Sequence, residues 1–167
     1  MGFSFYTVDS DYCDFLREKD SCVPFTMDSK ANRPFVGIVF CVNGFNYFAP
    51  LTSPKPKHKK MKNQTDFLKI KGGEWGAINL NNMIPVTKSA LHKIEINLSS
   101  SLSVSEIAYN NLLSNQLSWC NANRVVILRQ AEKLYNIITT GKARDELRLR
   151  CCSFLVDEER CRLYSQK

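Results

Sequence analysis

The sequence predicts an α+β fold, in which helices pack outside a twisted antiparallel sheet that curls into a partial barrel. Residues 35–51 form two apolar runs around Asn43-Gly44, and three shorter strand-like runs follow before residue 87. Beyond residue 99, apolar residues recur with helical spacing instead. Because strands precede helices rather than alternate with them, we expect a sheet core with helices outside it. Neither an internal repeat nor a linker is evident, so residues 1–167 are expected to form one domain.

The first elements are predicted to be a strand and a short helix. Residues 3–8 alternate in polarity and are rich in aromatic side chains, which favours a strand. Asp9 or Ser10 then provides a cap for a helix that continues to Lys19. Residues 24–32 are polar and typical of turns, so we expect a loop that delivers Arg33 to the next strand.

A central hairpin is the clearest local signal. Residues 35–42 are almost continuously apolar and β-branched, which predicts the first strand. Asn43-Gly44 suits the positive φ angles of a two-residue turn, and residues 45–51 form the second, antiparallel strand. Residues 54–61 are lysine-dense and contain two prolines, which predicts an exposed loop without ladder or helix. The three short strand-like runs are residues 67–70, 76–80 and 83–86, the first two separated by Gly72-Gly73.

The second half is predicted to be helical. Ser103 and Glu106 make a capping box, and Gly141 suits the end of a later helix. We interpret two apolar stripes as core faces and nothing more; they comprise Tyr109, Leu112, Leu113, Leu117 and Cys120, then Ile127, Ala131, Leu134, Tyr135 and Ile138. Residues 154–164 predict a short charged helix whose weak apolar contacts are Leu155, Cys161 and Leu163.

Composition favours a polyanionic partner. Lys and Arg number 23 against 16 Asp and Glu, a formal charge of +7, which points to nucleic acid. No apolar stretch approaches the length of a membrane span and no basic amphipathic helix is evident, so we expect no membrane. The seven cysteines are odd in number and lack a C-x-x-C pair, which indicates a reduced cytoplasmic protein with small buried thiols. With only two histidines, we expect neither a metal nor another cofactor.

The positive charge is concentrated after the hairpin. Residues 55–71 hold seven lysines and one histidine against a single aspartate. Such a run is often only a solvated face. Here, however, Thr52-Ser53-Pro54-Lys55 precedes it and presents two hydroxyls and an amine at a strand end, where a phosphate could react. The candidate RNA contacts are Lys57, His58, Lys59, Lys60, Lys62 and Lys69.

These residue types suit RNA cleavage without a metal. The 2′-hydroxyl of the substrate serves as nucleophile, so the protein must accept its proton, stabilise the phosphorane and protonate the leaving oxygen. Arg33 suits bidentate phosphate contact, Lys55 supplies a point charge, and Tyr12 is placed to donate from the first helix. Ser53 is too weak a base unaided, and His58 fits either a base or a phosphate contact, so the base stays open.

Each candidate also has an ordinary structural interpretation. Thr52 and Ser53 are typical of turn hydroxyls, and Tyr12 and Tyr47 are typical of core aromatics with a hydrogen-bonded tip. His92 is interpreted as a surface or half-buried histidine without a role.

Four blocks of the sequence resemble the ToxN/AbiQ family in the same order. They are residues 5–12 (Phe5-Tyr6-Thr7-Val8 with Tyr12), 33–39 (Arg33-Pro34-Phe35-Val36-Gly37-Ile38-Val39), 47–58 (Tyr47-Phe48-Ala49-Pro50-Leu51-Thr52-Ser53-Pro54-Lys55-Pro56-Lys57-His58) and 78–86 (Ile78-Asn79-Leu80-Asn81-Asn82-Met83-Ile84-Pro85-Val86). The third block is long and unusual, and therefore the most specific. The helical half resembles the family mainly in layout.

The resemblance implies a type III toxin-antitoxin endoribonuclease with a twisted sheet related to the Kid/MazF toxins. It implies cleavage of adenine-rich cellular or phage mRNA in the bacterial cytoplasm, leaving a 2′,3′-cyclic phosphate and a 5′-hydroxyl. It also implies inhibition by a pseudoknot antitoxin RNA. The toxin would cut this RNA from a longer precursor, and closed protein-RNA assemblies would form as it does so. Ser53 is then the first candidate for catalysis, with Thr52 and Lys55 beside it. Arg33 keeps a cation where lysine is expected in relatives, and some relatives carry a tyrosine near Ser29.

Two other classes of function remain open from the residues. A non-catalytic RNA-binding module would combine the charge of +7 with aromatic side chains that stack on bases, namely Phe45, Tyr47, Phe48 and Trp75. A structural partner protein would carry the basic face incidentally.

Overall fold

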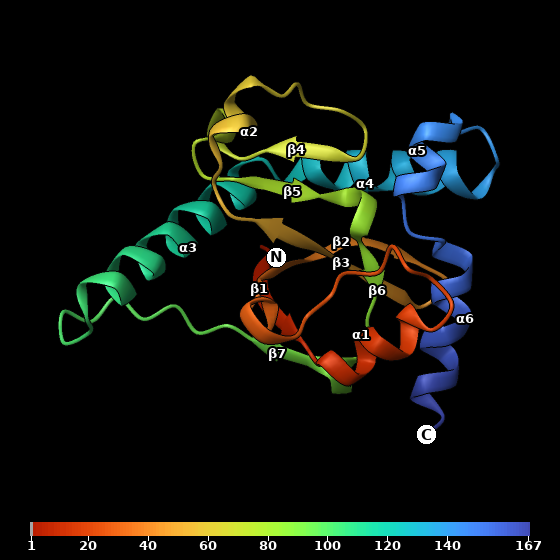
Figure 1. The fold of residues 1–167 in the computed structure, drawn as a ribbon, viewed down its shortest axis with the longest axis horizontal. Coiled ribbons are helices and arrows are strands. Elements are labelled where there is room, and N and C mark those ends of the chain that lie inside the picture. The colour runs from red at the N-terminus through yellow and green to blue at the C-terminus, as the bar shows by residue number, and fades with distance from the viewer. Residues whose placement is uncertain (1) are drawn as a thin grey trace.

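A computed structural model describes residues 2–167 and confirms the α+β class (Figure 1). The strands form one seven-stranded sheet in the order β4-β5-β3-β2-β1-β7, with β6 beside β3, and every pair is antiparallel. The strands are β1 (Ser4–Val8), β2 (Phe35–Val42), β3 (Phe45–Thr52), β4 (Phe67–Lys69), β5 (Ala77–Asn79), β6 (Ile84–Pro85) and β7 (Leu91–Lys93).

The predicted hairpin is the centre of this sheet. Strands β2 and β3 pair from Phe35 opposite Pro50 to Val42 opposite Phe45. Asn43 and Gly44 have φ angles of 49° and 83°, the positive values that the sequence predicted. The free ends of the hairpin are held together because the Leu51 N–H donates to the Pro34 carbonyl at 2.9 Å. The start of β2 therefore lies beside the end of β3.

The helices surround the sheet, and α6 covers α1 and β6 while α4 covers β2. Figure 1 shows α3 extending past the sheet on the side of β3 and β5. The helices are α1 (Ser10–Arg17), α2 (Pro56–Lys60), α3 (Val104–Ala122), α4 (Arg124–Thr139), α5 (Asp145–Arg150) and α6 (Phe154–Ser165). Within residues 2–167, no helix combines the length and apolar character that crossing a membrane needs.

Three predictions about local structure need correction. Residues 54–61 were expected to lack a helix, but α2 begins at Pro56. Proline is compatible with a first helical position, where its missing N–H has no partner to lose. Strand β7 and helix α5 were not predicted at all; β7 is three residues long and α5 buries no side chain, so neither carries a clear pattern.

Helix α6 buries charged residues instead of two of its predicted apolar contacts. Leu155 and Leu163 are 57% and 41% exposed, whereas Cys161 is buried as expected. Glu158 is buried and accepts hydrogen bonds from the hydroxyls of Tyr47 at 2.8 Å and Tyr135 at 2.7 Å. These two hydrogen bonds connect α6 to β3 and α4, and they offset the cost of burying the charge of Glu158.

A second buried acid lies at the junction of α6 with the segment after α1. Asp157 is fully buried, and neither of its oxygens has a hydrogen-bond partner within residues 2–167. Asp20, beside it, accepts from the N–H groups of Cys22 and Ser153. Burial, then the charge of Asp20, raises the pKa of Asp157 to about 9. Asp157 is therefore held as a neutral acid at pH 7.

The same place holds a grouping that the sequence analysis missed. Donor atoms of Asp20, Asp157 and Cys152 lie within 4.8 Å of one another, close enough to hold a metal ion. Our expectation of no metal considered only neighbouring cysteines and histidines, and these three residues are far apart in the chain. The thiols are buried as expected at Cys13, Cys120, Cys151, Cys152 and Cys161, but Cys22 is half-buried and Cys41 is exposed.

We predict that Asp157→Asn abolishes one pH-dependent loss of stability. Between its unfolded pKa near 4 and its folded pKa of about 9, Asp157 binds more proton in the folded state than in the unfolded state. Stability therefore falls as the pH rises through that range and levels above it. Urea unfolding is measured in EDTA at pH 5 and pH 8. Between these values, the free energy of unfolding of the wild type should fall by at least about 1 kcal/mol more than that of the variant. The exposed Asp145→Asn is the control, and parallel pH profiles for wild type and Asp157→Asn would contradict the prediction.

Candidate active site

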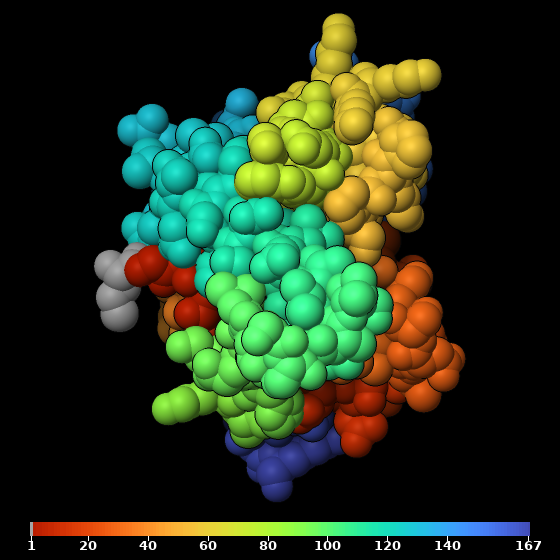
Figure 2. Space-filling model, turned by 90° about the vertical axis from the view of Figure 1, so that its left-hand side faces the viewer, coloured from red at the N-terminus to blue at the C-terminus, as the bar shows by residue number. Residues whose placement is uncertain are grey.

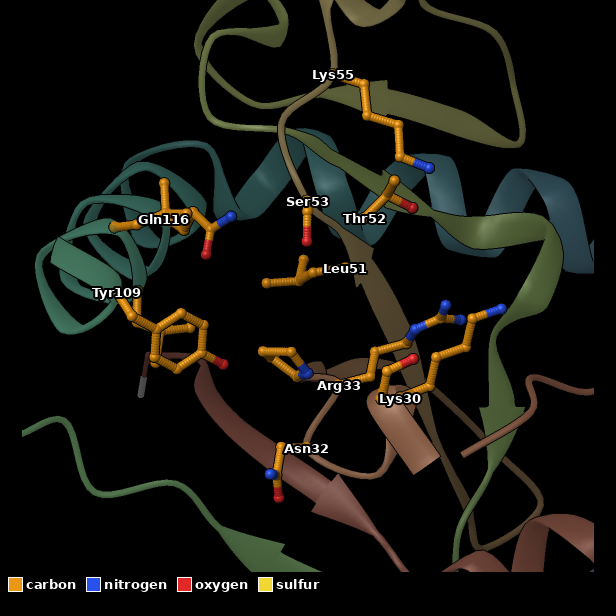
Figure 3. A pocket seen from close by; sticks show the side chains of 13 residues that line it. Lys30, Asn32, Arg33, Leu51, Thr52, Ser53, Lys55, Tyr109 and Gln116 are labelled. Carbon is orange, nitrogen blue, oxygen red and sulfur yellow. The ribbon is translucent and has the colours of Figure 1, made fainter. Parts of the chain in front are cut away.

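A pocket of about 480 Å³ opens at the free ends of the hairpin (Figure 3). Three segments far apart in the chain meet there: the loop before β2, the end of β3, and α3. Figure 2 shows this side of the molecule, with α3 between the orange loop before β2 and the yellow segment around α2. The lining residues are Ser29, Lys30, Asn32, Arg33, Pro34, Leu51, Thr52, Ser53, Lys55, Tyr109, Leu112, Leu113 and Gln116.

Four of the five predicted catalytic residues share this pocket: Arg33, Thr52, Ser53 and Lys55. The register of the hairpin explains this meeting, because residues just before β2 and just after β3 emerge side by side. The sequence identified these residues from a loop and a strand end, and the structure brings them together.

Positive charge in the pocket has no acidic counterpart. Lys30, Arg33 and Lys55 line it, and none of them forms an ion pair within residues 2–167. No aspartate, glutamate or histidine is among the lining residues. Arg33 is half-buried, and burial lowers the pKa of its guanidinium, which still stays charged at neutral pH. The pocket therefore suits an anion and lacks the carboxylates that hard divalent cations prefer.

The two hydroxyls are presented in different ways. Thr52 pairs with Ala77 in β5, and its Oγ1 accepts a hydrogen bond from the Asn79 amide. Because that oxygen already accepts, the Thr52 hydroxyl proton is free to be donated to a ligand. Ser53 is exposed, and Figure 3 shows its hydroxyl directed into the middle of the pocket.

Two glycines allow the backbone approach that holds this strand end. Gly76 has a φ of 92°, and a Cβ there would lie 2.1 Å from the Thr52 carbonyl oxygen. A Cβ on Gly73 would lie 2.6 Å from the backbone carbon of His58. Only glycine permits both contacts. From the sequence, Gly73 was predicted only as part of a strand break, and Gly76 had no predicted role.

His58 does not reach the pocket. Its side chain is buried, and Nδ1 accepts the Lys55 N–H at 3.3 Å, which caps the first turn of α2. Burial, followed by the charges of Lys57 and Lys55, lowers the pKa of the imidazole. His58 is thus a neutral capping residue, and its predicted position on an exposed loop, as base or phosphate contact, is wrong.

Tyr12 also lies away from the pocket. It is fully buried, its hydroxyl donates to the Pro85 carbonyl, and its ring packs edge-on against Tyr164 at 4.9 Å. Burial raises the pKa of the phenol. The ordinary interpretation of Tyr12 as a core aromatic is the one that the structure supports, and its predicted contact with substrate needs correction.

Beyond Lys55, the lysine-rich segment flanks the pocket without lining it. Four of its predicted RNA contacts are exposed on or just after α2, and Lys69 is half-buried on β4. None of these five forms an ion pair within the described residues. The exposed four are Lys57, Lys59, Lys60 and Lys62. They extend the positive field of the pocket along the surface.

Sequence reasoning missed the contribution of α3. The stripe containing Tyr109, Leu112 and Leu113 was interpreted as core, yet these residues and Gln116 form one wall of the pocket. Tyr109 is 46% exposed. The available signal was Gln116 itself, a polar residue in line with Leu113 and Cys120 on an otherwise apolar face. Lys30 and Asn32, in a loop without pattern, were also missed.

Comparisons with known proteins point to one family. Residues 4–162 match the family model described as toxin ToxN of the type III toxin-antitoxin system. An endoribonuclease ToxN from Bacillus thuringiensis subsp. kurstaki is 32% identical over 167 residues, which cover 98% of this chain and 84% of that protein.

Two solved structures superpose over the whole of both chains. One, described as selective toxin inhibition by a non-coding RNA pseudoknot in type III systems, has a TM-score of 0.81 and 30% identity. The other is AbiQ, a lactococcal anti-phage endoribonuclease of a type III system, with a TM-score of 0.84 and 26% identity. The chain therefore belongs to the ToxN/AbiQ family of type III toxin-antitoxin toxins.

Proposed function

We propose that this toxin is an endoribonuclease that cleaves RNA without a metal, through attack of the substrate 2′-hydroxyl. The observation that carries the proposal is the pocket that Lys30, Arg33 and Lys55 line together with Thr52 and Ser53, with no carboxylate among the lining residues. Relatives of similar length are endoribonucleases, which supports the reaction class.

The lining residues suit the charge changes of that reaction. The 2′-oxygen forms a bond to phosphorus, the bond from phosphorus to the 5′-oxygen breaks, and the products are a 2′,3′-cyclic phosphate and a 5′-hydroxyl. Arg33 and Lys55 neutralise the additional negative charge of the phosphorane, while the Thr52 and Ser53 hydroxyls donate hydrogen bonds to its oxygens. One proton leaves the 2′-hydroxyl and one reaches the 5′-oxygen, so no proton is gained or lost overall. Since no imidazole or carboxylate lines the pocket, its hydroxyl and amine groups carry this transfer.

The same cations suit an inhibitory RNA. We propose that a pseudoknot antitoxin RNA lies across Arg33, Lys55 and residues 57–62, and that the two form a closed protein-RNA assembly in the bacterial cytoplasm. Cellular or phage mRNA would be the substrate once the antitoxin is lost. A related toxin is inhibited by a non-coding RNA pseudoknot, which supports this partner class.

Burial weighs against a purely RNA-binding module. Of the aromatic residues offered for base stacking, Tyr47 and Phe48 are buried, and Phe45 and Trp75 are half-buried. Lys71 covers the ring of Trp75, with Nζ 4.2 Å from its centroid. An extended stacking platform is therefore missing among the four predicted residues, whereas the reactive hydroxyls are exposed in a positive pocket.

We predict that Ser53→Ala lowers RNA cleavage at least about 100-fold, because a donor to the phosphorane is lost. Purified wild type and variant are incubated in EDTA with a defined RNA, and the new ends are mapped. Wild type should yield cyclic-phosphate and 5′-hydroxyl ends, and Ser53→Ala should still bind the RNA. Ser118→Ala, an exposed serine on α3, is the matched control. Equal rates for wild type and Ser53→Ala would refute the role of Ser53, and absence of cleavage by both would favour the binding module.

Tyr12→Phe should separate a core residue from a catalytic one. Cleavage should stay within about twofold of wild type, while the free energy of unfolding falls by about 1–2 kcal/mol because the buried Pro85 carbonyl loses its donor. Urea unfolding and initial cleavage rates are measured on the same preparation. A hundredfold slower reaction with unchanged stability would return Tyr12 to the catalytic set.

Replacing Lys57, Lys59, Lys60 and Lys62 together with alanine should weaken RNA binding and its salt dependence. If all four contact phosphates of single-stranded RNA, the slope of log affinity against log salt becomes shallower by about 3. The measurement uses the Ser53→Ala background, so that the RNA stays intact. Substituting Arg129, Lys133 and Lys142, which lie on and after α4, should leave the slope unchanged. Equal slopes with and without the four lysines would show that this segment does not contact RNA.

A further inference from the structure

We propose that the α3 wall of the pocket is a base-binding subsite, and that Gln116 selects a nucleobase with an amine at the adenine N6 or cytosine N4 position beside the scissile phosphate. This inference rests on the proposed ribonuclease function, which supplies the phosphate on the opposite wall. Three other α3 residues complete the subsite: Tyr109, Leu112 and Leu113.

The pocket has two chemically different walls. Figure 3 shows Lys55, Thr52, Arg33 and Lys30 on one side, with the side chains of α3 facing them from the other. Ser53 lies between the two walls, with its hydroxyl directed into the space that they enclose. A nucleotide whose phosphate meets the cations and Ser53 would therefore extend its sugar and base toward α3.

Packing fixes the orientation of the Gln116 amide. Gln116 is only 3% exposed, and Nε2 donates to the Trp75 carbonyl at 2.8 Å. A carbonyl oxygen only accepts, so the nitrogen of the amide must face Trp75 and the oxygen must face away. Figure 3 shows Oε1 directed into the pocket, and it accepts no hydrogen bond within residues 2–167. The fold thus presents one oriented acceptor to the pocket.

The surroundings of this acceptor suit the flat face of a base. Of the residues that line the pocket with it, Leu113 and Leu51 are buried, Leu112 is half-buried, and Tyr109 is 46% exposed. Unstacked bases in RNA bind by stacking on aromatic side chains, with their edges read by hydrogen bonds. Apolar walls around a single oriented polar group are the usual construction of a small-ligand site.

An acceptor discriminates between base edges. The N6 amine of adenine and the N4 amine of cytosine donate hydrogen bonds, whereas guanine O6 and uracil O4 accept them at the corresponding positions. When that position of the base faces Oε1 of Gln116, adenine or cytosine donates to it, whereas guanine O6 or uracil O4 opposes it with lone pairs. Adenine or cytosine is therefore the expected base in this subsite.

The test measures cleavage of RNAs that differ in one functional group. A substrate with adenosine on both sides of its mapped cleavage site is prepared, and each adenosine in turn is replaced with purine riboside, which lacks the amine, or with inosine, which carries a carbonyl there. At one of the two positions, wild-type kcat/KM should fall about tenfold with purine riboside and further with inosine. Gln116→Met should cleave the three RNAs at rates within about twofold of one another. Asn115→Ala, an exposed neighbour on α3, should retain the wild-type discrimination.

Each result has a separate meaning. Equal cleavage of all analogues by wild type, or discrimination that persists in Gln116→Met, would overturn the subsite and leave the nuclease standing. Failure of wild type to cleave any RNA would instead overturn the proposed function.

A second pair of variants covers the case in which Gln116→Met does not fold. Tyr109 is placed as a stacking surface, so Tyr109→Phe should keep kcat/KM within about threefold and Tyr109→Ala should raise KM about tenfold or more. An unchanged KM in Tyr109→Ala would overturn the stacking role, and so would an equal loss of kcat in both variants.

Discussion

The antiparallel pairing of β2 with β3 is the constraint on which the candidate site depends. A two-residue turn at Asn43-Gly44 fixes the register from one end, and the Leu51-Pro34 hydrogen bond closes the other. Since side chains alternate along a strand, a slip of one residue would move the side chains of one strand to the opposite face of the sheet. Packing opposes such a slip, because a Cβ on Gly37 would lie 2.1 Å from the ring of Phe48 in the present register. Core packing between Gly37 and Phe48 therefore helps to fix the register that places Arg33 and Ser53 in one pocket.

Local chemistry explains what the sequence could predict. The turn type, the two long strands and the hydroxyls after β3 are all specified by neighbouring residues, so the hairpin and four pocket residues could be identified in advance. Tyr12 and His58 could not be placed, because their polar atoms are satisfied inside the protein. The acceptor for Tyr12 is Pro85, 73 residues away. Nothing near Tyr12 in the chain distinguishes a phenol bound to a core carbonyl from one bound to substrate.

Helices posed a different difficulty, since periodicity finds an apolar stripe but not the element that covers it. In α6 the expected contacts Leu155 and Leu163 are largely exposed, while Glu158 is buried because Tyr47 and Tyr135 approach it from β3 and α4. In α3 the stripe divides along its length. Cys120 packs in the core, whereas Tyr109 reaches the pocket. Both outcomes depend on tertiary packing between segments that are distant in sequence.

The distribution of charge separates the parts of the molecule that stabilise the fold from the part that meets a ligand. The buried acids Glu158, Asp20 and Asp66 are satisfied by phenols, backbone N–H groups and Arg150 respectively, and Asp157 is held neutral at pH 7. In the pocket, Lys30, Arg33 and Lys55 have no acidic partner within residues 2–167, so a bound anion would relieve their mutual repulsion. Any RNA bound there would stabilise the folded protein by mass action. Substrate and inhibitory RNA would compete for the same three cations. Inhibition then requires only that the bound RNA does not align a 2′-hydroxyl for attack. Occupancy of the pocket would be sufficient, without a conformational change in the toxin.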